Sequence, residues 1–265
     1  MLKNSTFYKL QDLFYRLTGI KLKENKKYLV ENRLSKFVGE NKNFKTFEDF
    51  YDALVTDPSG NLKNLLIQAL ITNYTFFFRE PIHFSFLRWY LRNNKEKQPY
   101  LRIWSCGCST GEEAYSIAIT ALMELPNLQQ YDFKILASDV VKEYILQAKQ
   151  GIFSKHKLEN FNKELILKYF DYLPHLESYQ IKQRVKEFIA FRILNLISPF
   201  PFTKEFDIIF LRNVLIYFTL EEKKEIIKKI YPYIKRNGYL ILGLTESLTG
   251  IPHSFEVLKY SIYKK

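Results

Sequence analysis

Acidic and amide side chains follow three apolar runs of this sequence, and this spacing could gather them into one ligand site. A turn with two glutamates comes after LRIWSC, Asp139 ends the run FKILASD, and Asn213 comes after FDIIFL. Parallel α/β sheets bind ligands beyond the carboxyl ends of their strands, where an acidic residue after the second strand can accept both hydroxyls of a ribose. These positions therefore predict a site for a ribose-containing ligand.

The stretch Leu101 to Leu122 is typical of a strand that leads through a turn into a helix. It begins with an apolar run, passes through the turn GCSTG, and continues with apolar residues at helical spacing. The start of such a helix offers free backbone N–H groups to a ligand. Gly107 and Gly111 form G-x-x-x-G instead of the G-x-G-x-x-G of dinucleotide sites, which argues against a dinucleotide.

Each acidic residue near this turn also has a purely structural interpretation. Ser109 and Thr110 each precede a glutamate by three residues, so Glu112 and Glu113 could complete capping boxes. Asp139 could likewise cap the helix that begins VVKEYILQAKQG. The sequence alone leaves both interpretations open.

Composition narrows the class of protein and the kind of partner. The 265 residues suffice for a medium domain with an appendage or for two domains, and nearly half are hydrophobic. We expect a cytoplasmic protein without membrane insertion, because no apolar run approaches a membrane span and no signal-peptide core follows Met1. The two cysteines, Cys106 and Cys108, predict neither a disulfide framework nor a metal site. A formal charge of +12 favours an acidic partner without identifying it.

Residues 1–70 show helical spacing and predict a small all-α domain. The stretch from Lys21 to Lys45 is rich in lysine, and Lys26, Arg33 and Lys36 can share one face of a helix. The apolar residues of that helix would turn inward; they are Leu29, Val30, Leu34 and Phe37. This face is either the solvated side of an amphipathic helix or a docking surface for a negatively charged partner.

The segment 71–92 links this domain to the rest of the chain. It opens with ITNYTFFFRE, in which polar residues alternate with aromatic ones, and a helical stretch ends near Arg92. The aromatic rings could simply pack, or they could attract a cationic ligand by about 0.5–2 kcal/mol.

Residues 93–265 alternate between strand and helix patterns. Beyond the first strand, we expect strands at Phe133 to Ala137, Phe206 to Leu211 and Tyr239 to Leu242, with helices between them. This order is typical of a doubly wound, mostly parallel sheet. The more polar residues 155–192 interrupt it, and Ser178 to Ala190 could form a small antiparallel insertion.

The assembled motifs resemble the CheR family of chemotaxis receptor methyltransferases. TNYTFFFRE is similar to the family's T-N-x-T-x-F-F-R-E, and IWSCGCSTGEEAYSIAI to its W-S-x-x-x-S-T-G-E-E-x-Y-S-I-A-I. ASDV, FDIIFLRNVLIYF and GYLILGLTESL continue the match in order, so the resemblance covers nearly the whole chain.

This resemblance implies a Rossmann-like methyltransferase domain that binds S-adenosylmethionine, carries a small β-subdomain insertion and follows an all-α domain. It implies methylation of glutamate carboxylates on the cytoplasmic helical region of chemoreceptors, with Lys26, Arg33 and Lys36 as the docking face. In some relatives the insertion binds a receptor C-terminal peptide through a Gly-rich loop. FDYLPHLESYQIKQR has no glycine and is shorter, which argues against such tethering here.

The resemblance also assigns site residues by position. The cofactor contacts of the family fall on Asn73, Thr75, Arg79, Glu112, Asp139, Asn195, Leu196, Arg212 and Asn213. Tyr217 and Arg92 are candidates for positioning the incoming carboxylate. We expect no general base, because a glutamate with a reference pKa of about 4.3 is already ionised at neutral pH.

Two other classes of function remain as alternatives. A nucleic-acid methyltransferase would suit the positive charge, although RNVLIYF lacks an Asn-Pro-Pro-Tyr-like base-flipping motif. A non-catalytic cofactor-sensing or scaffold protein could keep the same fold without turnover. On the resemblance, we expect neither nucleic-acid binding nor a metal.

Overall fold

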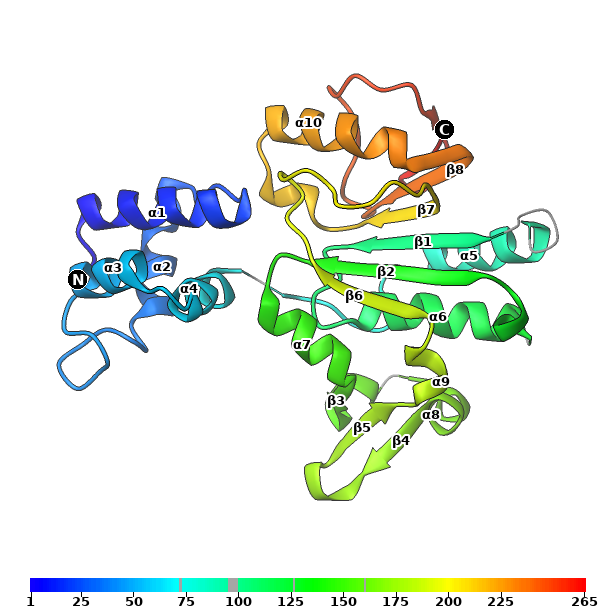
Figure 1. Cartoon of the computed structure of the whole chain (residues 1–265), viewed down its shortest axis with the longest axis horizontal. Coiled ribbons are helices and arrows are strands. Elements are labelled where there is room, and N and C mark those ends of the chain that lie inside the picture. Colours follow the sequence, from blue (N-terminus) through cyan, green and yellow to red (C-terminus); the bar gives the residue numbers. More distant parts are fainter. Residues whose placement is uncertain (72, 95–99, 126, 160) are drawn as a thin grey trace.

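The computed structural model describes residues 1–71, 73–94, 100–125, 127–159 and 161–265, and it comprises a helical domain, an α/β domain and a small β insertion (Figure 1). Thr72, the first residue of the TNYTFFFRE motif, lies outside the described residues. Within the described part, no helix has both the length and the apolar character needed to cross a bilayer.

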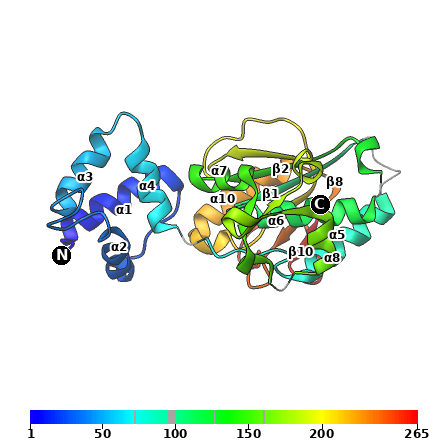
Figure 2. The ribbon, with the colours of Figure 1, turned by 90° about the horizontal axis from the view of Figure 1, so that it is seen from below.

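The helical domain lies beside the α/β domain (Figure 2). Its four helices are α1 (Asn4–Thr18), α2 (Lys27–Leu34), α3 (Phe47–Thr56) and α4 (Asn61–Leu70). Phe7, Leu10 and Phe14 recur on one face of α1 and are buried in the core of this domain. Gly19 ends α1 at a φ of 74°, a conformation that glycine adopts without strain.

The α/β domain is built on a seven-stranded sheet with the order β6-β2-β1-β7-β8-β10-β9. The five strands from β6 to β8 are parallel, whereas β10 pairs antiparallel with β8 and β9 antiparallel with β10. The strands are β1 (Leu101–Cys106), β2 (Phe133–Asp139), β6 (Ile189–Ile193), β7 (Phe206–Leu211), β8 (Ile234–Leu242), β9 (Glu256–Val257) and β10 (Ile262–Lys264).

Helices cover both faces of this sheet, as the apolar strands require. The four helices are α5 (Pro81–Asn94), α6 (Glu112–Glu124), α7 (Lys142–Gln150) and α10 (Leu220–Ile230). Ile103 and Phe210 belong to the core beneath α5, α6 and α7. Their strand neighbours Trp104 and Ile209 point to the other face and belong to the core beneath α10. The predicted doubly wound sheet is therefore confirmed.

The insertion carries a three-stranded antiparallel sheet of order β3-β5-β4. Its strands are β3 (Ile152–Ser154), β4 (Phe170–Leu173) and β5 (Ser178–Ile181), and its helices are α8 (Lys163–Tyr169) and α9 (Gln183–Lys186). The sequence analysis placed a small antiparallel insertion in Ser178 to Ala190, and this is correct for β5 alone. The two strands that pair with β5 come earlier in the chain, and β6 pairs with β2 in the main sheet.

Candidate functional site

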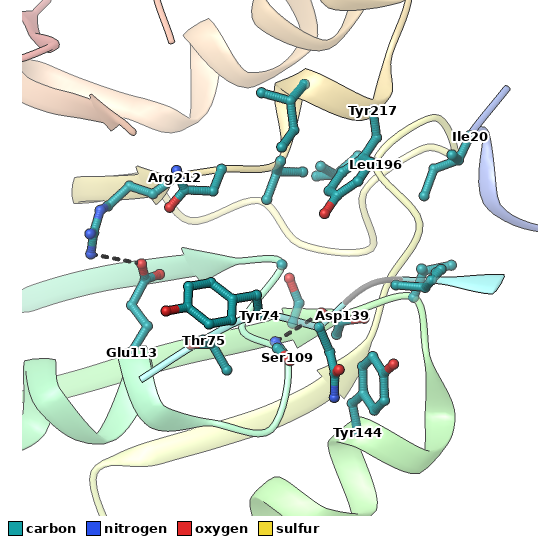
Figure 3. Close-up of a pocket in the computed structure, with 18 of the residues that line it drawn as sticks. Ile20, Tyr74, Thr75, Ser109, Glu113, Asp139, Tyr144, Leu196, Arg212 and Tyr217 are labelled. Carbon is teal, nitrogen blue, oxygen red and sulfur yellow. Dashed lines mark hydrogen bonds and ion pairs between the residues drawn. The ribbon is translucent and has the colours of Figure 1, made fainter. Parts of the chain in front are cut away.

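A cavity of about 260 Å³ lies at the carboxyl ends of β1, β2 and β7 (Figure 3). Its walls come from the turn after β1, the end of β2, the segment before α5, the loop after β7 and the end of α1. The topology explains this place, because the parallel strands β1, β2 and β7 lie side by side and end at the same edge.

Asp139 is held in this cavity by the backbone. Its Oδ2 accepts the N–H of Ser109 at 2.9 Å and its Oδ1 the N–H of Val141 at 3.0 Å. Burial raises the pKa of Asp139, and these backbone N–H groups only partly oppose the shift. A carboxylate has about four lone-pair sites, so both oxygens keep capacity for ligand hydroxyls. The side chain thus supports the start of α7 and also faces the cavity.

Glu113 is the acidic residue that the first turn contributes to the cavity. Its Oε1 accepts the hydroxyl of Ser105 at 2.7 Å, and its Oε2 accepts Arg212 at 3.1 Å. Arg212 is also paired with Glu80 at 3.0 Å, and its side chain is only 1% exposed. Burial raises the pKa of Glu113, and its effect is larger than the opposing effect of the Arg212 guanidinium.

Glu112, the glutamate assigned by resemblance, does not line the cavity. Its side chain is completely buried, its Oε2 accepts the hydroxyl of Thr110 at 2.6 Å, and its Oε1 is bonded to Lys157 of the insertion. Adjacent residues of a helix point about 100° apart, which sends Glu112 and Glu113 to different surroundings. Neither forms a capping box, because Gly111 is the N-cap and makes no side-chain bond.

The segment before α5 forms one wall of the cavity. Asn73, Thr75 and Arg79 all line it, as the resemblance implied. Arg79 donates to the carbonyl of Tyr74 at 2.8 Å, and its guanidinium lies 5.5 Å from the centre of the Tyr74 ring. The exposed Tyr74 and Phe76 also line the cavity, so the aromatic residues here are only partly packed.

Asn195 and Leu196 bring the chain after β6 to the same cavity. The Asn195 amide donates to the carbonyl of Leu17 at 3.1 Å, which ties this loop to the end of α1. Thr18 and Ile20 of the helical domain line the cavity as well. The helical domain is therefore part of the site.

The loop after β7 carries Asn213 and Tyr217 into the cavity, where the side chain of Tyr217 points inward (Figure 3). Asn213 adopts a φ of 57°. Glu246 holds this conformation by accepting the N–H groups of Asn213 at 2.6 Å and Ile216 at 3.2 Å. Burial raises the pKa of Tyr217, so its hydroxyl stays protonated near neutral pH.

Arg92 does not belong to this site. It lies in the last turn of α5, with its side chain 66% exposed, and it is paired with Glu124 of α6. The sequence prediction of a positioning role is therefore wrong. The C-terminal end of α5 points away from the carboxyl edge of the sheet (Figure 1).

A basic groove of about 920 Å³ adjoins the cavity between the helical domain and the loop before α10. The two share Ile20, Ile71, Ile216, Tyr217 and Phe218. The basic residues that line the groove are Lys21, Lys23, Lys26, Arg33 and Lys223. Arg33 is half-buried and donates to the carbonyl of Leu70 at 2.7 Å, whereas Lys36 is exposed and is not part of the lining.

Sequence reasoning missed several residues of this site. Neither Glu80 nor Glu246 stands at the end of an apolar run. Glu80 holds Arg212, and Glu246 holds the loop after β7. Tyr144 lines the cavity from α7, and burial raises its pKa to about 12. The motifs FFFRE and TESL contained the two glutamates, but nothing in their spacing indicated what they would contact.

Two family models match this chain and together cover nearly all of it. The model described as "CheR methyltransferase, all-alpha domain" matches residues 5–71. The model described as "CheR methyltransferase, SAM binding domain" matches residues 73–264.

Curated relatives that match over more than nine-tenths of their length agree with these models. A chemotaxis protein methyltransferase of Borreliella burgdorferi is 36% identical, over 97% of this chain and 93% of the relative. Chemotaxis protein methyltransferase 2 of Vibrio cholerae is 33% identical, over 98% and 91% of the two chains. The chemotaxis protein methyltransferase of Escherichia coli is 30% identical, over 99% and 91%.

The donor set of the cavity fits S-adenosylmethionine, the cofactor of this family. Asp139 keeps free lone pairs that ribose hydroxyls would fill, and the Glu113 carboxylate would accept the amino group at the methionine end. Arg79 can pair with the carboxylate of that end. The fold, the donor set, the two matching models and these relatives agree: the chain belongs to the CheR family of chemotaxis methyltransferases and uses S-adenosylmethionine as methyl donor.

Proposed function

We propose that this protein methylates glutamate side chains on the cytoplasmic helical region of chemoreceptors, giving glutamyl methyl esters and S-adenosylhomocysteine. The observation that carries the proposal is the continuity of the basic groove with the cavity, because the two share Tyr217 and its neighbours. An acidic helix in this groove would lie beside the opening of the cofactor cavity. A cytoplasmic location is part of this proposal, because the proposed acceptor is the cytoplasmic region of a receptor.

The residues of the site suit a reaction that needs positioning more than proton transfer. When bound, S-adenosylmethionine supplies an electrophilic methyl group on a sulfonium. A glutamate carboxylate is ionised at neutral pH and needs no base. Holding two reacting groups in line can supply several kcal/mol towards the barrier. Asp139, Glu113 and Arg79 would hold the cofactor, and they come from three separate elements.

Tyr217 is the residue we assign to the incoming carboxylate. Its side chain points into the cavity from the loop that also borders the groove (Figure 3). Burial is the main cause of its raised pKa, so the phenol stays protonated and can donate a hydrogen bond. Asn213, four residues earlier on the same loop, would line the edge where the methyl group is transferred.

Docking would use the basic residues of the groove. Of the three residues proposed from the sequence, Lys26 and Arg33 line the groove and Lys36 lies outside it. Arg33 also bonds the Leu70 carbonyl at the end of α4, so it has a structural role in addition to its charge. Surface charges of this kind favour fast association and specificity more than high affinity.

Two other functions are compatible with this groove and cavity. A nucleic-acid methyltransferase would also benefit from basic residues beside the cavity, and it would show a steep dependence of binding on salt. A cofactor-sensing or scaffold protein would bind S-adenosylmethionine without turnover. The acceptor and the chemistry of the product distinguish all three.

Transfer of labelled methyl groups tests the proposal. The protein would be incubated with labelled S-adenosylmethionine and one acceptor at a time, either receptor cytoplasmic fragments, DNA or RNA. We expect label on the receptor fragments that mild base releases as methanol, and its loss with Asp139→Ala. Base-stable label, or label on nucleic acid, would overturn the acceptor assignment. Cofactor binding without any transfer would favour the scaffold.

A further inference from the structure

Glu112 is a buried charge outside the cofactor cavity. It is the first residue of α6, and its side chain has no exposed surface. Moving a carboxylate out of water is costly unless it is paired and hydrogen-bonded. One oxygen accepts the hydroxyl of Thr110 at 2.6 Å, which leaves the charge itself to be balanced by another group.

Lys157 of the insertion supplies the balancing cation. Its ammonium contacts Glu112 Oε1 and lies 3.3 Å from Thr110 Oγ1. Lys157 belongs to a short 3-10 helix, Lys155–Leu158, that follows β3. Its side chain is 40% exposed, so the ammonium reaches the buried carboxylate from the surface. The insertion thus contacts the turn of the cofactor site through this pair.

The residues that this pair contacts lie next to the atoms that hold Asp139. Thr110 follows Ser109, whose N–H donates to Asp139 at 2.9 Å and whose φ is 49°. A positive φ is unfavourable for serine and persists only where neighbouring contacts maintain it. The bonds from Glu112 and Lys157 to Thr110 are such contacts. A charge on Glu112 left without Lys157 would therefore disturb this turn and loosen the support of Asp139.

We propose that Lys157 is a positioning residue for cofactor binding, which acts by neutralising Glu112 and so fixing the turn that supports Asp139. The role reaches the cofactor through Glu112, Thr110 and Ser109, because Lys157 is not among the described residues that line the cavity. The proposal rests on the binding of S-adenosylmethionine and does not depend on the methyl acceptor.

The two partners should respond differently to substitution. Lys157→Met strands a buried carboxylate, because Glu112 cannot reach water without moving the turn. Glu112→Gln leaves a lysine that is already partly exposed and can turn its ammonium to solvent. The double variant Lys157→Met with Glu112→Gln removes both charges together. These differences separate charge neutralisation from a general loss of packing.

Isothermal titration calorimetry with S-adenosylmethionine and with S-adenosylhomocysteine tests this role, well below the melting temperature of each variant. Lys157→Met should raise both dissociation constants by about tenfold. Lys157→Arg and Glu112→Gln should stay within about threefold, and the double variant should recover most of the lost affinity. Lys155→Met is the matched control: it removes the same charge from an exposed position of the same 3-10 helix, and its affinity should be unchanged.

Two results would overturn the proposal. If Lys157→Met lowers the melting temperature but leaves both dissociation constants unchanged, the pair serves the fold alone. If the double variant binds as weakly as Lys157→Met, the stranded charge of Glu112 is not the cause of the loss. Because both ligands are measured by binding, a failure to methylate receptors would not affect either conclusion.

Discussion

At the scale of single residues, two adjacent glutamates have different surroundings and different uses. Glu113 contacts Ser105 and Arg212 and lines the cavity, whereas Glu112 is bonded to Thr110 and Lys157 on another side of the turn. The sequence alone could not separate them, because both follow Gly111 and both fit a capping pattern. The difference arises from which neighbours the insertion and β7 bring to each side chain.

As the pH is lowered, cofactor affinity should begin to fall at a higher pH than it would if the carboxyl groups of the site had ordinary pKa values. Burial raises the pKa of both Asp139 and Glu113. Binding uses the ionised forms, so affinity is present above the raised pKa values and is lost as the pH falls through them. Calorimetric titration of S-adenosylmethionine from neutral pH downwards measures this decline.

The variant Glu113→Gln provides the control for this pH dependence. It should bind more weakly at neutral pH, and its affinity should decline less steeply with acidification because one titrating carboxyl is gone. An affinity that stays constant down to the ordinary carboxyl range, about pH 4, would contradict the assignment of these two residues.

At the scale of elements, the loop after β7 depends on a carboxylate from the segment after β8. Glu246 is buried and accepts the N–H groups of Asn213, Gly243 and Ile216. A carboxylate that accepts several backbone N–H groups fixes their relative positions. Because Tyr217 follows on the same loop, Glu246 determines where the proposed acceptor residue lies.

Glu246→Gln should slow methyl transfer more than it weakens cofactor binding. The amide replaces one acceptor oxygen with a donor, which cannot accept a backbone N–H and so releases part of the loop. We expect kcat to fall by about tenfold or more, since small displacements of reacting groups are costly. The dissociation constant should change by less than about threefold, because Asp139 and Glu113 come from other elements.

Steady-state kinetics and calorimetry on the same preparation check this difference, with Glu256→Gln as an exposed control on β9. An unchanged kcat in Glu246→Gln would show that the loop keeps its position without this carboxylate.

The sequence predicted the elements with strong periodicity and missed those that depend on distant pairing. FDIIFL and FKILASD are apolar on both faces, so β7 and β2 were predicted from pattern alone. β6 was placed in the insertion, because IAFRI is short and partly exposed and only its pairing with β2 defines it. β9 and β10 were missed for the same reason.

The site residues divide in the same way. Asp139 and Asn213 follow directly from the ends of strands, whereas Arg212 and the segment Asn73 to Arg79 follow from the resemblance. Arg92 was misassigned because the sequence does not show which end of α5 faces the cavity. Arg92 lies in the last turn of this helix, at the end away from the cavity. Glu80 and Glu246 act through tertiary contacts that no local pattern indicates.

At the scale of the whole molecule, the helical domain closes one side of the cofactor cavity and forms one side of the groove. Gly19 packs so tightly against Ile197 that an added Cβ would lie 2.7 Å from its Cγ2. Tyr15 of α1 is hydrogen-bonded to Glu222 of α10, and Asn195 is bonded to Leu17. The groove between them is lined by Arg33 of α2 and Lys223 of α10.

The central claim of this account is that the basic groove guides an acidic receptor helix to the cofactor cavity. The most direct test compares two double variants with the same change in net charge. Lys26→Glu with Lys223→Glu alters residues that line the groove, and Lys36→Glu with Lys228→Glu alters exposed residues that do not. KM for receptor fragments, kcat and the dissociation constant of S-adenosylmethionine are measured for both.

We expect the groove variant to raise KM for receptor by about tenfold or more at low salt, while cofactor affinity stays within about twofold and the control variant resembles the unmodified protein. If both variants raise KM equally, net charge rather than the groove guides the receptor. If the groove variant methylates receptor with unchanged KM, the acceptor does not enter by this route and the central claim is wrong.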